Sequence, residues 1–295
     1  MPTTPYVSPA AFTAHPTYLD LDGLRVDSAN PADQTAELAN ILLKASAWAD
    51  SACDMPIGAH LYVQNQRARC DRAGMVRLHA DHSPVLSVAG FGYGWTPTAL
   101  TSLPSPSAWI EGGANMVIPL GSTSGAWSGA LQFGSPAAGS ELFAQVTYVA
   151  GWVATQFAAD ALAGATSVTV ADPTGIMPGG RYRIWEPGTE ETVTVSSTWT
   201  PPAPSATPAA TAVTLVSPLV NAHTRGADVS EMPADMRLAV IQYAVALLMR
   251  PDTVAEDSFP DTPLASSTRS SDPRQRATGL VAEAASILRN YTRVR

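Results

Sequence analysis

The chain has 295 residues, 45% of them hydrophobic, which is enough to bury a core in one large domain or in two to three small ones. Only 14% are charged and the formal net charge is −8, which argues against a general nucleic-acid coat because phosphate binding needs clustered Lys and Arg. No apolar run approaches the ~20 residues that cross a bilayer and the N-terminus has no signal-peptide pattern, so we expect a cytoplasmic product without a membrane partner.

The charge is distributed unevenly along the chain. Residues 269–295 carry six arginines against two acidic residues, which makes the C-terminus a basic tail on an acidic body. Arg289 suits either the C-terminal end of a helix, where the helix dipole favours a cation, or an acidic partner. Arg293 and Arg295 lie beyond that helix and suit a partner's acidic surface or a solvated chain end.

The N-terminal part of the sequence predicts an arm followed by a helix. Residues 1–30 are expected to form an extended N-terminal arm with one short helical turn, because prolines recur along it. Asn30 followed by Pro31 is typical of a helix start, and apolar residues then recur at three- and four-residue spacing through about Cys53. The apolar face of this helix consists of Leu38, Ile41, Leu42, Ala45, Trp48 and Ala49.

Residues 57–155 are predicted to form a β segment, because short alternating or β-branched runs are separated by turns, as in an antiparallel sheet or small barrel. The runs are HLYVQNQRARC, GMVRLHA, PVLSVAGFGYGW, SAWIEG, NMVIPLG and LFAQVTYVAGWVA. Three prolines predict a long loop over residues 95–107. Tyr93, Trp95 and Trp109 form either an aromatic contact surface or ordinary sheet packing.

Residues 156–230 are predicted to be a small β-module inserted into a larger body. TSVTVAD, RYRIW, ETVTVSST and AVTLVSPL alternate in the manner of strands, and the glycines of GIMPGG suit a tight turn. Residues 200–211 are rich in Pro, Ala, Ser and Thr and lie between the third and fourth runs. Such a tract cannot enter a sheet, so we expect an exposed tip loop there.

Two helices are predicted near the C-terminus. The first, over residues 234–250, is apolar around most of its circumference, which indicates burial in a bundle or in an assembly. One face of it consists of Leu238, Ile241, Val245 and Leu248. The final helix, about 273–291, has a single apolar stripe. The predicted fold is therefore α+β, with a helical core over 31–56 and 231–295, antiparallel β segments and the inserted β-module.

The sequence offers little that resembles catalytic or metal chemistry. His79, Asp81 and His82 form the one cluster with metal-ligand residue types, but in an extended segment His82 points away from the other two. The hypothesis that the protein is an enzyme predicts loss of activity when these three residues are changed. Cys53 and Cys70 make neither a disulfide framework nor a zinc pattern and are expected to be reduced. No catalytic, cofactor-binding or metal-binding residue is assigned, and no cofactor is expected.

Several stretches of this sequence resemble one family. They are ANPADQTAELANILLKASAWADSAC, HSPVLSVAGFGYGW, ATSVTVADPTGIMPGGRYRIWEPGTEETVTV and LVNAHTRGADVSEMPADMRLAVIQYAVALLMR, followed by a closing amphipathic helix. Together they look like the head-to-tail connector (adaptor) proteins of tailed bacteriophages, particularly long-tailed phages of actinobacteria. The resemblance covers most of the chain from about Asn30, and it rests on patterns rather than on catalytic signatures. The inserted β-module departs from the minimal pattern of that family.

The resemblance implies a non-enzymatic virion protein at the head–tail junction. Such adaptors form a homo-oligomeric ring, usually of about twelve copies, that lies beneath the portal protein, meets a stopper or tail-terminator protein and surrounds passing double-stranded DNA. The residues implied in packing the ring body are Leu38, Ile41, Leu42, Trp48, Leu238, Ile241, Val245 and Leu248. Those implied in portal docking are Arg289, Tyr291, Arg293 and Arg295.

Other functions remain open at this stage. A stopper or another minor neck or tail protein would carry more β structure and less helix. A carbohydrate-binding β-module of a tail-associated protein predicts exposed aromatic rings at Tyr93, Trp95 and Trp109. The ring hypothesis itself predicts that terminal helices of neighbouring copies complete each other's apolar faces. Low charge density is compatible with this, because interface cores are depleted in charged residues.

Overall fold

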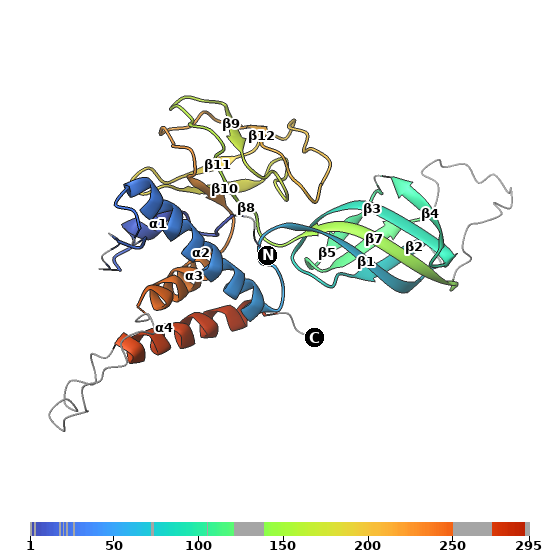
Figure 1. The fold of residues 1–295 in the computed structure, drawn as a ribbon. Coiled ribbons are helices and arrows are strands. Elements are labelled where there is room, and N and C mark those ends of the chain that lie inside the picture. The colour runs from blue at the N-terminus through green and yellow to red at the C-terminus, as the bar shows by residue number, and fades with distance from the viewer. Residues whose placement is uncertain are drawn as a thin grey trace, which may run out of the picture.

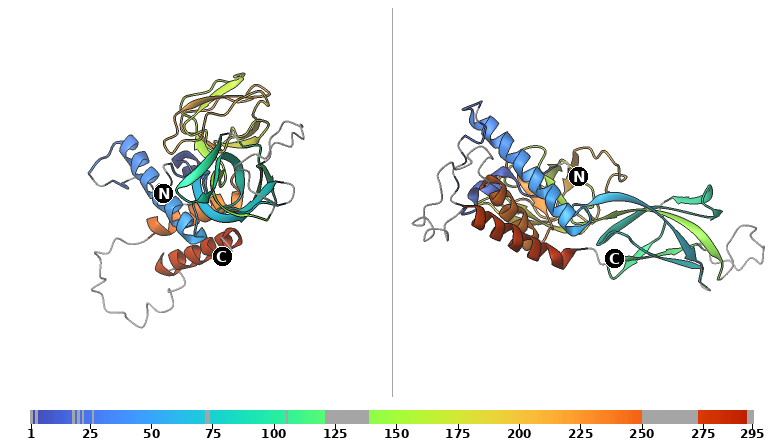
Figure 2. Two further views of the ribbon diagram at one scale, coloured as in Figure 1. Left: turned by 90° about the vertical axis from the view of Figure 1, so that its right-hand side faces the viewer. Right: turned by 60° about the horizontal axis from the view of Figure 1, so that its bottom comes forward.

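The structure is a computed structural model that describes residues 2, 4–17, 19, 21, 23–25, 27–71, 74–104, 106–120, 139–249 and 273–292. It contains a helical unit and two β units, each built around its own buried hydrophobic cluster. The helices lie at one end of an elongated molecule and the larger β unit lies at the other, as Figures 1 and 2 show. The predicted α+β class is confirmed.

The helical unit combines the two ends of the chain. Its helices are α1 (Pro9–Ala14), α2 (Pro31–Cys53), α3 (Ala234–Leu248) and α4 (Pro273–Leu288), and the 3₁₀ turn η2 (Arg289–Tyr291) follows α4. As the sequence predicts, the Asn30 side chain caps α2 by accepting a hydrogen bond from the Ala32 amide at 3.1 Å. The shared core includes Phe12, Leu42, Met236, Val240 and Leu288.

The N-terminal residues form one short helix, α1, as expected, but they do not extend away from the body. Tyr6, Val7 and Phe12 are buried in the core of the helical unit. The C-terminal helices also pack within one chain, since α3 lies between α2 and α4. The apolar stripe of α4 buries Ala284 and Leu288 in that core.

The larger β unit, which we call the β lobe, is a sandwich of two antiparallel sheets (Figure 1). Its strands are β1 (His60–Arg69), β2 (Met75–His79), β3 (Val85–Thr96), β4 (Ala99–Pro104), β5 (Trp109–Glu111), β6 (Asn115–Pro119) and β7 (Glu141–Ala150). One sheet has the order β1-β7-β3-β4 and the other has the order β2-β6-β5. Alternate residues of both sheets, among them Phe91, Ile118 and Tyr148, fill the space between them.

Residues 95–107 were predicted to be a loop because of their prolines, but the structure has a strand, β4, within them. β4 pairs antiparallel with β3 through a tight turn at Pro97 and Thr98. It is an edge strand, and Pro104 is its last residue. An edge position tolerates proline because one side of the strand has no ladder hydrogen bonds to lose.

The smaller β unit, which we call the β-module, contains β8 (Ala154–Gln156), β9 (Ser167–Val170), β10 (Arg181–Trp185), β11 (Glu191–Thr194), β12 (Thr211–Thr214) and β13 (Asp228–Ser230). Its sheets have the orders β11-β10-β13-β8 and β12-β9. Pairing of β8 with β13 closes the module at its base. The tract over 200–211 joins β11 to β12 and is exposed along most of its length.

A buried ion pair joins the β-module to the helical unit. Asp228 on β13 and Arg237 on α3 are both buried, and Arg237 Nη2 lies 2.8 Å from Asp228 Oδ2. Burial raises the pKa of the Asp228 carboxyl, and hydrogen bonds from Arg237, Ser8 and Gln156 act in the opposite direction. The guanidinium also donates to the Tyr6 carbonyl at 2.7 Å.

The N-terminal segment continues this junction toward the β lobe. The Tyr6 hydroxyl donates to Asp50 Oδ1 at 2.7 Å, and the same carboxylate oxygen accepts the Ile57 amide at 2.9 Å. The Gly58 amide in turn donates to the Tyr6 hydroxyl at 2.9 Å. Residues 6–8 therefore contact the β-module, the end of α2 and the start of the β lobe.

We expect Arg237→Met to lower the free energy of unfolding by about 3–5 kcal/mol, because it leaves the Asp228 carboxylate buried without its cation. Denaturant titration followed by circular dichroism measures this change. Arg25→Met is the control, since the Arg25–Asp27 pair is exposed and its loss should change little. Equal effects of the two substitutions would contradict the structural role given to the buried pair.

Candidate functional site

The solvent side of α3 is an unusual surface because it carries large aliphatic residues. Leu238, Ile241, Val245 and Leu248, which we call the α3 stripe, are half-buried and fall within an arc of roughly 80° on the helix. Alanines 239, 244 and 246 are buried instead. These small residues allow neighbouring segments to approach α3 closely, and Met236 and Val240 fill the core beside them.

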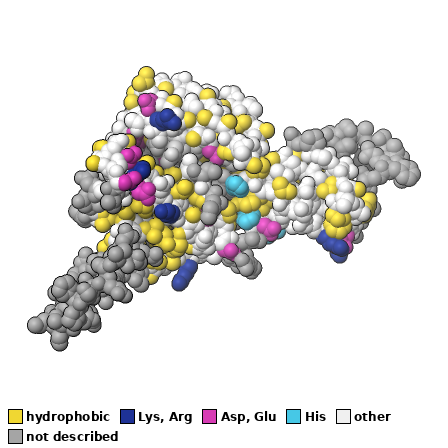
Figure 3. Space-filling view, in the orientation of Figure 1, with side chains coloured by type: hydrophobic (Ala, Val, Ile, Leu, Met, Phe, Trp, Pro, Cys, Tyr) yellow, Lys and Arg dark blue, Asp and Glu magenta, His cyan; other side chains and the backbone are white. Residues whose placement is uncertain are grey.

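Half-buried apolar groups occur on two sides of α3. On the side opposite the α3 stripe, Trp48 of α2 stacks on Tyr243 with ring centroids 3.9 Å apart. On the side of the stripe, Leu238 and Ile241 line a groove of about 330 Å³. Its other walls come from α1 and from the turn after β10, where the groove meets Trp185 and Pro187. Figure 3 shows hydrophobic side chains gathered over the helical unit.

The residues that the sequence assigns to ring packing fall into two groups. Leu38 and Leu42 are fully buried in the core of the single chain, whereas Ile41 and Trp48 are half-buried at its edge. All four residues of the α3 stripe belong to the half-buried group. Among these eight residues, the half-buried ones are therefore the ones accessible to another protein.

The predicted portal-docking residues are also divided. Arg289 is exposed in η2, and Arg293 and Arg295 lie outside the described residues. The Tyr291 hydroxyl donates to the Asp235 carboxylate, with distances of 2.9 and 2.8 Å to its two oxygens. The Tyr291 ring meets the edge of Trp152 at 5.8 Å. Burial and the Asp235 carboxylate raise the pKa of Tyr291 to about 12. Tyr291 thus ties η2 to the start of α3.

The cluster of His79, Asp81 and His82 does not converge on one point. His79 Nδ1 lies 2.9 Å from Asn115 Oδ1 on the surface of the β lobe, whereas the His82 ring stacks on Tyr62 with centroids 4.0 Å apart. His79 and Asp81 line a cleft of about 770 Å³. Within the part of the chain that the structure describes, no three His, Cys, Asp or Glu side chains are grouped to hold a metal ion.

The three aromatic residues near the predicted loop have different environments. Tyr93 is half-buried and packs on the core of the β lobe beside Phe91, with ring centroids 6.1 Å apart. The side chains of Trp95 and Trp109 are 59% and 44% exposed. Sheet packing therefore explains Tyr93, and the two tryptophans are available for contact with other molecules.

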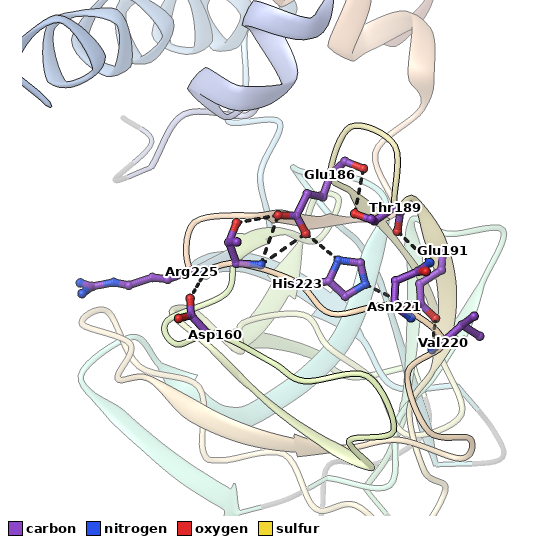
Figure 4. A network of polar contacts seen from close by, with 9 residues as sticks. Asp160, Glu186, Thr189, Glu191, Val220, Asn221, His223 and Arg225 are labelled. Atoms are coloured by element: carbon purple, nitrogen blue, oxygen red, sulfur yellow. Dashed lines mark hydrogen bonds and ion pairs between the residues drawn. The ribbon is translucent and has the colours of Figure 1, made fainter. Parts of the chain in front are cut away.

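A polar network in the β-module has no counterpart in the sequence predictions (Figure 4). His223 is completely buried between two carboxylates: its Nδ1 lies 2.7 Å from Glu186 Oε2 and its Nε2 lies 2.9 Å from Glu191 Oε1. Each of these two short contacts requires one proton between the ring nitrogen and the carboxylate oxygen. The three side chains therefore share two protons. In the sequence, His223 is 37 residues from Glu186 and 32 residues from Glu191, so no local motif predicts this network.

The same carboxylates hold the loop that carries His223. Glu186 accepts the hydroxyl and the amide of Thr224, and Glu191 accepts the amides of Val220 and Asn221. Burial alone would raise the pKa of both carboxyls, but the hydrogen bonds from these groups and from His223 lower the pKa of each below its ordinary value. The buried His223 ring is a structural clamp for the 220–224 loop.

No protein-family description and no curated protein sequence matches this chain. Within the described residues, none of the helices combines the length and the apolar character needed to cross a membrane.

We expect acid to loosen the 220–224 loop. Glu186 and Glu191 have folded pKa values below the ordinary 4.5, so their stabilisation is complete above that pH and is lost as the pH falls through the lowered values. Hydrogen exchange at the Val220, Asn221 and Thr224 amides should accelerate, after correction for the intrinsic rate, when the pH falls from 6 toward 3.

The matched variants are a Glu186→Gln, Glu191→Gln double substitution and Glu190→Gln, which changes an exposed neighbour. The double variant should have reduced amide protection at pH 6 and a weaker dependence on pH, whereas Glu190→Gln should behave as the wild type. Identical pH profiles in all three proteins would refute the clamp.

Proposed function

We propose that the protein is a structural component of a tailed-phage virion, a head–tail adaptor that forms a homo-oligomeric ring between the portal and the stopper or tail-terminator protein. The observation that supports this proposal most strongly is the α3 stripe. On this helix at the centre of its own bundle, four large aliphatic residues on one side are only half-buried, whereas the exposed side of a helix in a monomeric protein usually carries charged or polar residues.

A ring requires two unlike surfaces on each copy, because its contacts are heterologous. The α3 stripe and the adjoining groove at Trp185 supply one apolar surface that spans the helical unit and the β-module. The buried Asp228–Arg237 pair fixes these two parts relative to each other. A neighbouring copy would therefore meet a surface that is already in place before assembly.

The charge distribution is compatible with the same role. A net charge of −8 leaves an acidic body, and an acidic or neutral channel wall would not retain the phosphates of passing DNA. The arginines at the C-terminus, of which Arg289 is exposed in η2, would bind an acidic surface of the portal.

A stopper or another minor neck or tail protein is the alternative, and the two separate β units favour it. The two functions differ in the partner that binds first. An adaptor binds the portal directly, whereas a stopper requires the adaptor. Pull-down of the purified protein with the portal protein of the same phage distinguishes them.

We expect Val245→Asp to prevent ring formation, because a carboxylate in the middle of the α3 stripe would be desolvated at the subunit contact. Native mass spectrometry of the protein, alone and mixed with its portal protein, measures the subunit number. Val220→Asp is the matched control, since Val220 is 77% exposed on the β-module. Circular dichroism of both variants establishes that they fold.

A second readout uses the wild type alone. Hydrogen exchange along α3 should slow when monomers assemble. Assembly of Val245→Asp to the same subunit number as the wild type, or unchanged exchange along α3 in the assembled state, would contradict the proposed contact.

We also expect Arg289→Glu combined with Arg293→Glu and Arg295→Glu to weaken portal binding and to make the remaining binding less sensitive to salt. Surface plasmon resonance at two ionic strengths measures both effects. Arg181→Glu, a change at an exposed residue of the β-module, is the control. Unaltered affinity of the triple variant would remove the C-terminus from the portal contact.

A further inference from the structure

The outer face of the β2-β6-β5 sheet carries an ordered group of aromatic and polar side chains. Strand register places Arg77, Val117 and Trp109 in one row across this sheet, and His79, Asn115 and Glu111 in the next row. Residues paired directly across strands share a face. Five of the six are exposed, and Val117 is fully buried although it is not part of the cluster between the two sheets.

Hydrogen bonds hold these side chains in place. Trp109 Nε1 donates to Glu111 Oε1 at 3.3 Å, and Arg77 Nη1 donates to Glu111 Oε2 at 2.9 Å. In the second row, His79 Nδ1 and Asn115 Oδ1 are 2.9 Å apart. The carboxylate of Glu111 thus fixes both the indole and the guanidinium. The rings and planar groups are ordered before any ligand arrives, which reduces the entropy lost on binding.

Polar atoms of this face remain available to a ligand. Among the described residues, Arg77 Nη2, Asn115 Nδ2 and His79 Nε2 have no hydrogen-bond partner, and all three side chains are exposed. A half-exposed tryptophan ring lies in the row beside them. We call Arg77, His79, Trp109, Glu111 and Asn115 the Trp109 face.

We propose that the Trp109 face binds a neutral saccharide. An indole ring offers a flat, electron-rich surface for the C–H groups of a pyranose ring. Planar amide, imidazole and guanidinium groups beside it match the hydroxyl groups at the rim of the sugar.

The same features make other ligands less suitable. The charge of Arg77 is balanced by Glu111 at 2.9 Å, so the face has no excess positive charge for a phosphate or a nucleic acid. One tryptophan ring is also a small apolar area for a protein interface, which buries about 800 Å² on each partner.

The surroundings indicate an extended saccharide. His79, at one end of the Trp109 face, also lines the cleft of about 770 Å³. Gly112 and Gly113, in the turn between β5 and β6, and Asp81 form its wall on the β lobe. A chain of sugars stacked on Trp109 can continue past His79 into this cleft. Sugars joined by β-1,4 bonds suit this arrangement, because they form extended chains whose rings present flat faces.

This site lies on the β lobe and does not depend on the proposed ring. The probes are chitotetraose and cellotetraose, with α-1,4-linked maltotetraose as the comparison, each titrated into the full-length protein by isothermal calorimetry. We expect one of the two β-1,4-linked probes to bind. Trp109→Ala should weaken that binding about tenfold, which corresponds to the loss of one stacked ring.

Trp95→Ala is the matched control, because Trp95 is also exposed but lies at the far end of β3 in the other sheet. Its affinity should equal that of the wild type. Arg77→Gln, which removes the free guanidinium nitrogen, should weaken binding as well. In the unmodified protein, the NMR resonance of the Trp109 indole N–H should shift when the saccharide is added, while that of Trp95 should not. This measurement tests the proposal even if a variant fails to fold.

Binding of neither β-1,4-linked probe at millimolar concentration overturns the proposal, as does binding that survives Trp109→Ala. Loss of assembly with a neck protein in Trp109→Ala, without saccharide binding by the wild type, would assign this face to a protein partner instead.

Discussion

The Asp228–Arg237 ion pair is the interaction on which the arrangement of this molecule depends. It is buried at the point where β13 of the β-module meets α3, and the N-terminal segment closes over it through Ser8 and Tyr6. Compared with apolar residues, a buried ion pair adds little net stability. Separating the two charges is strongly unfavourable, however, because an unpaired charge in the interior raises the free energy of the folded state. It therefore specifies how the β-module sits on the helices. The groove beside Trp185 and the α3 stripe exist as one surface only because of this junction.

Helix α3 packs at the centre of its bundle and still leaves four large aliphatic side chains only half-buried. Its buried residues include several alanines, and its solvent side carries the α3 stripe. A bundle of three helices can be close-packed with alanine at the contacts, but the hydrophobic gain then comes from few methyl groups. The α3 stripe remains half-exposed, and it is the surface that the adaptor proposal assigns to association between chains.

Local patterns explain which parts of the fold the sequence could predict. Asn30 and Pro31 marked the start of α2, and alternation marked most strands of both β units, because these signals act over a few neighbouring residues. β4 was missed because it contains Pro104 and has Pro97 and Pro106 on either side. Prolines are compatible with an edge strand, but only the sheet order shows that β4 is one. Other features depend on residues that are distant in sequence, so hydrophobic periodicity cannot predict them. These are the burial of Tyr6 and Phe12, the Asp228–Arg237 pair and the His223 clamp. For the candidate surfaces, the sequence named the residues of the α3 stripe and Trp109, but only the register placed Arg77, Glu111 and Asn115 beside that tryptophan.

The central claim is that copies of this chain associate through the outward side of α3. Electron cryomicroscopy of the protein assembled with its portal tests it most directly. The account predicts a closed ring in which Leu238, Ile241, Val245 and Leu248 of each copy are buried against a different surface of the next, with the β lobes extending away from the helical ring. A ring in which these four side chains face solvent, or a single copy bound to the portal, would contradict it.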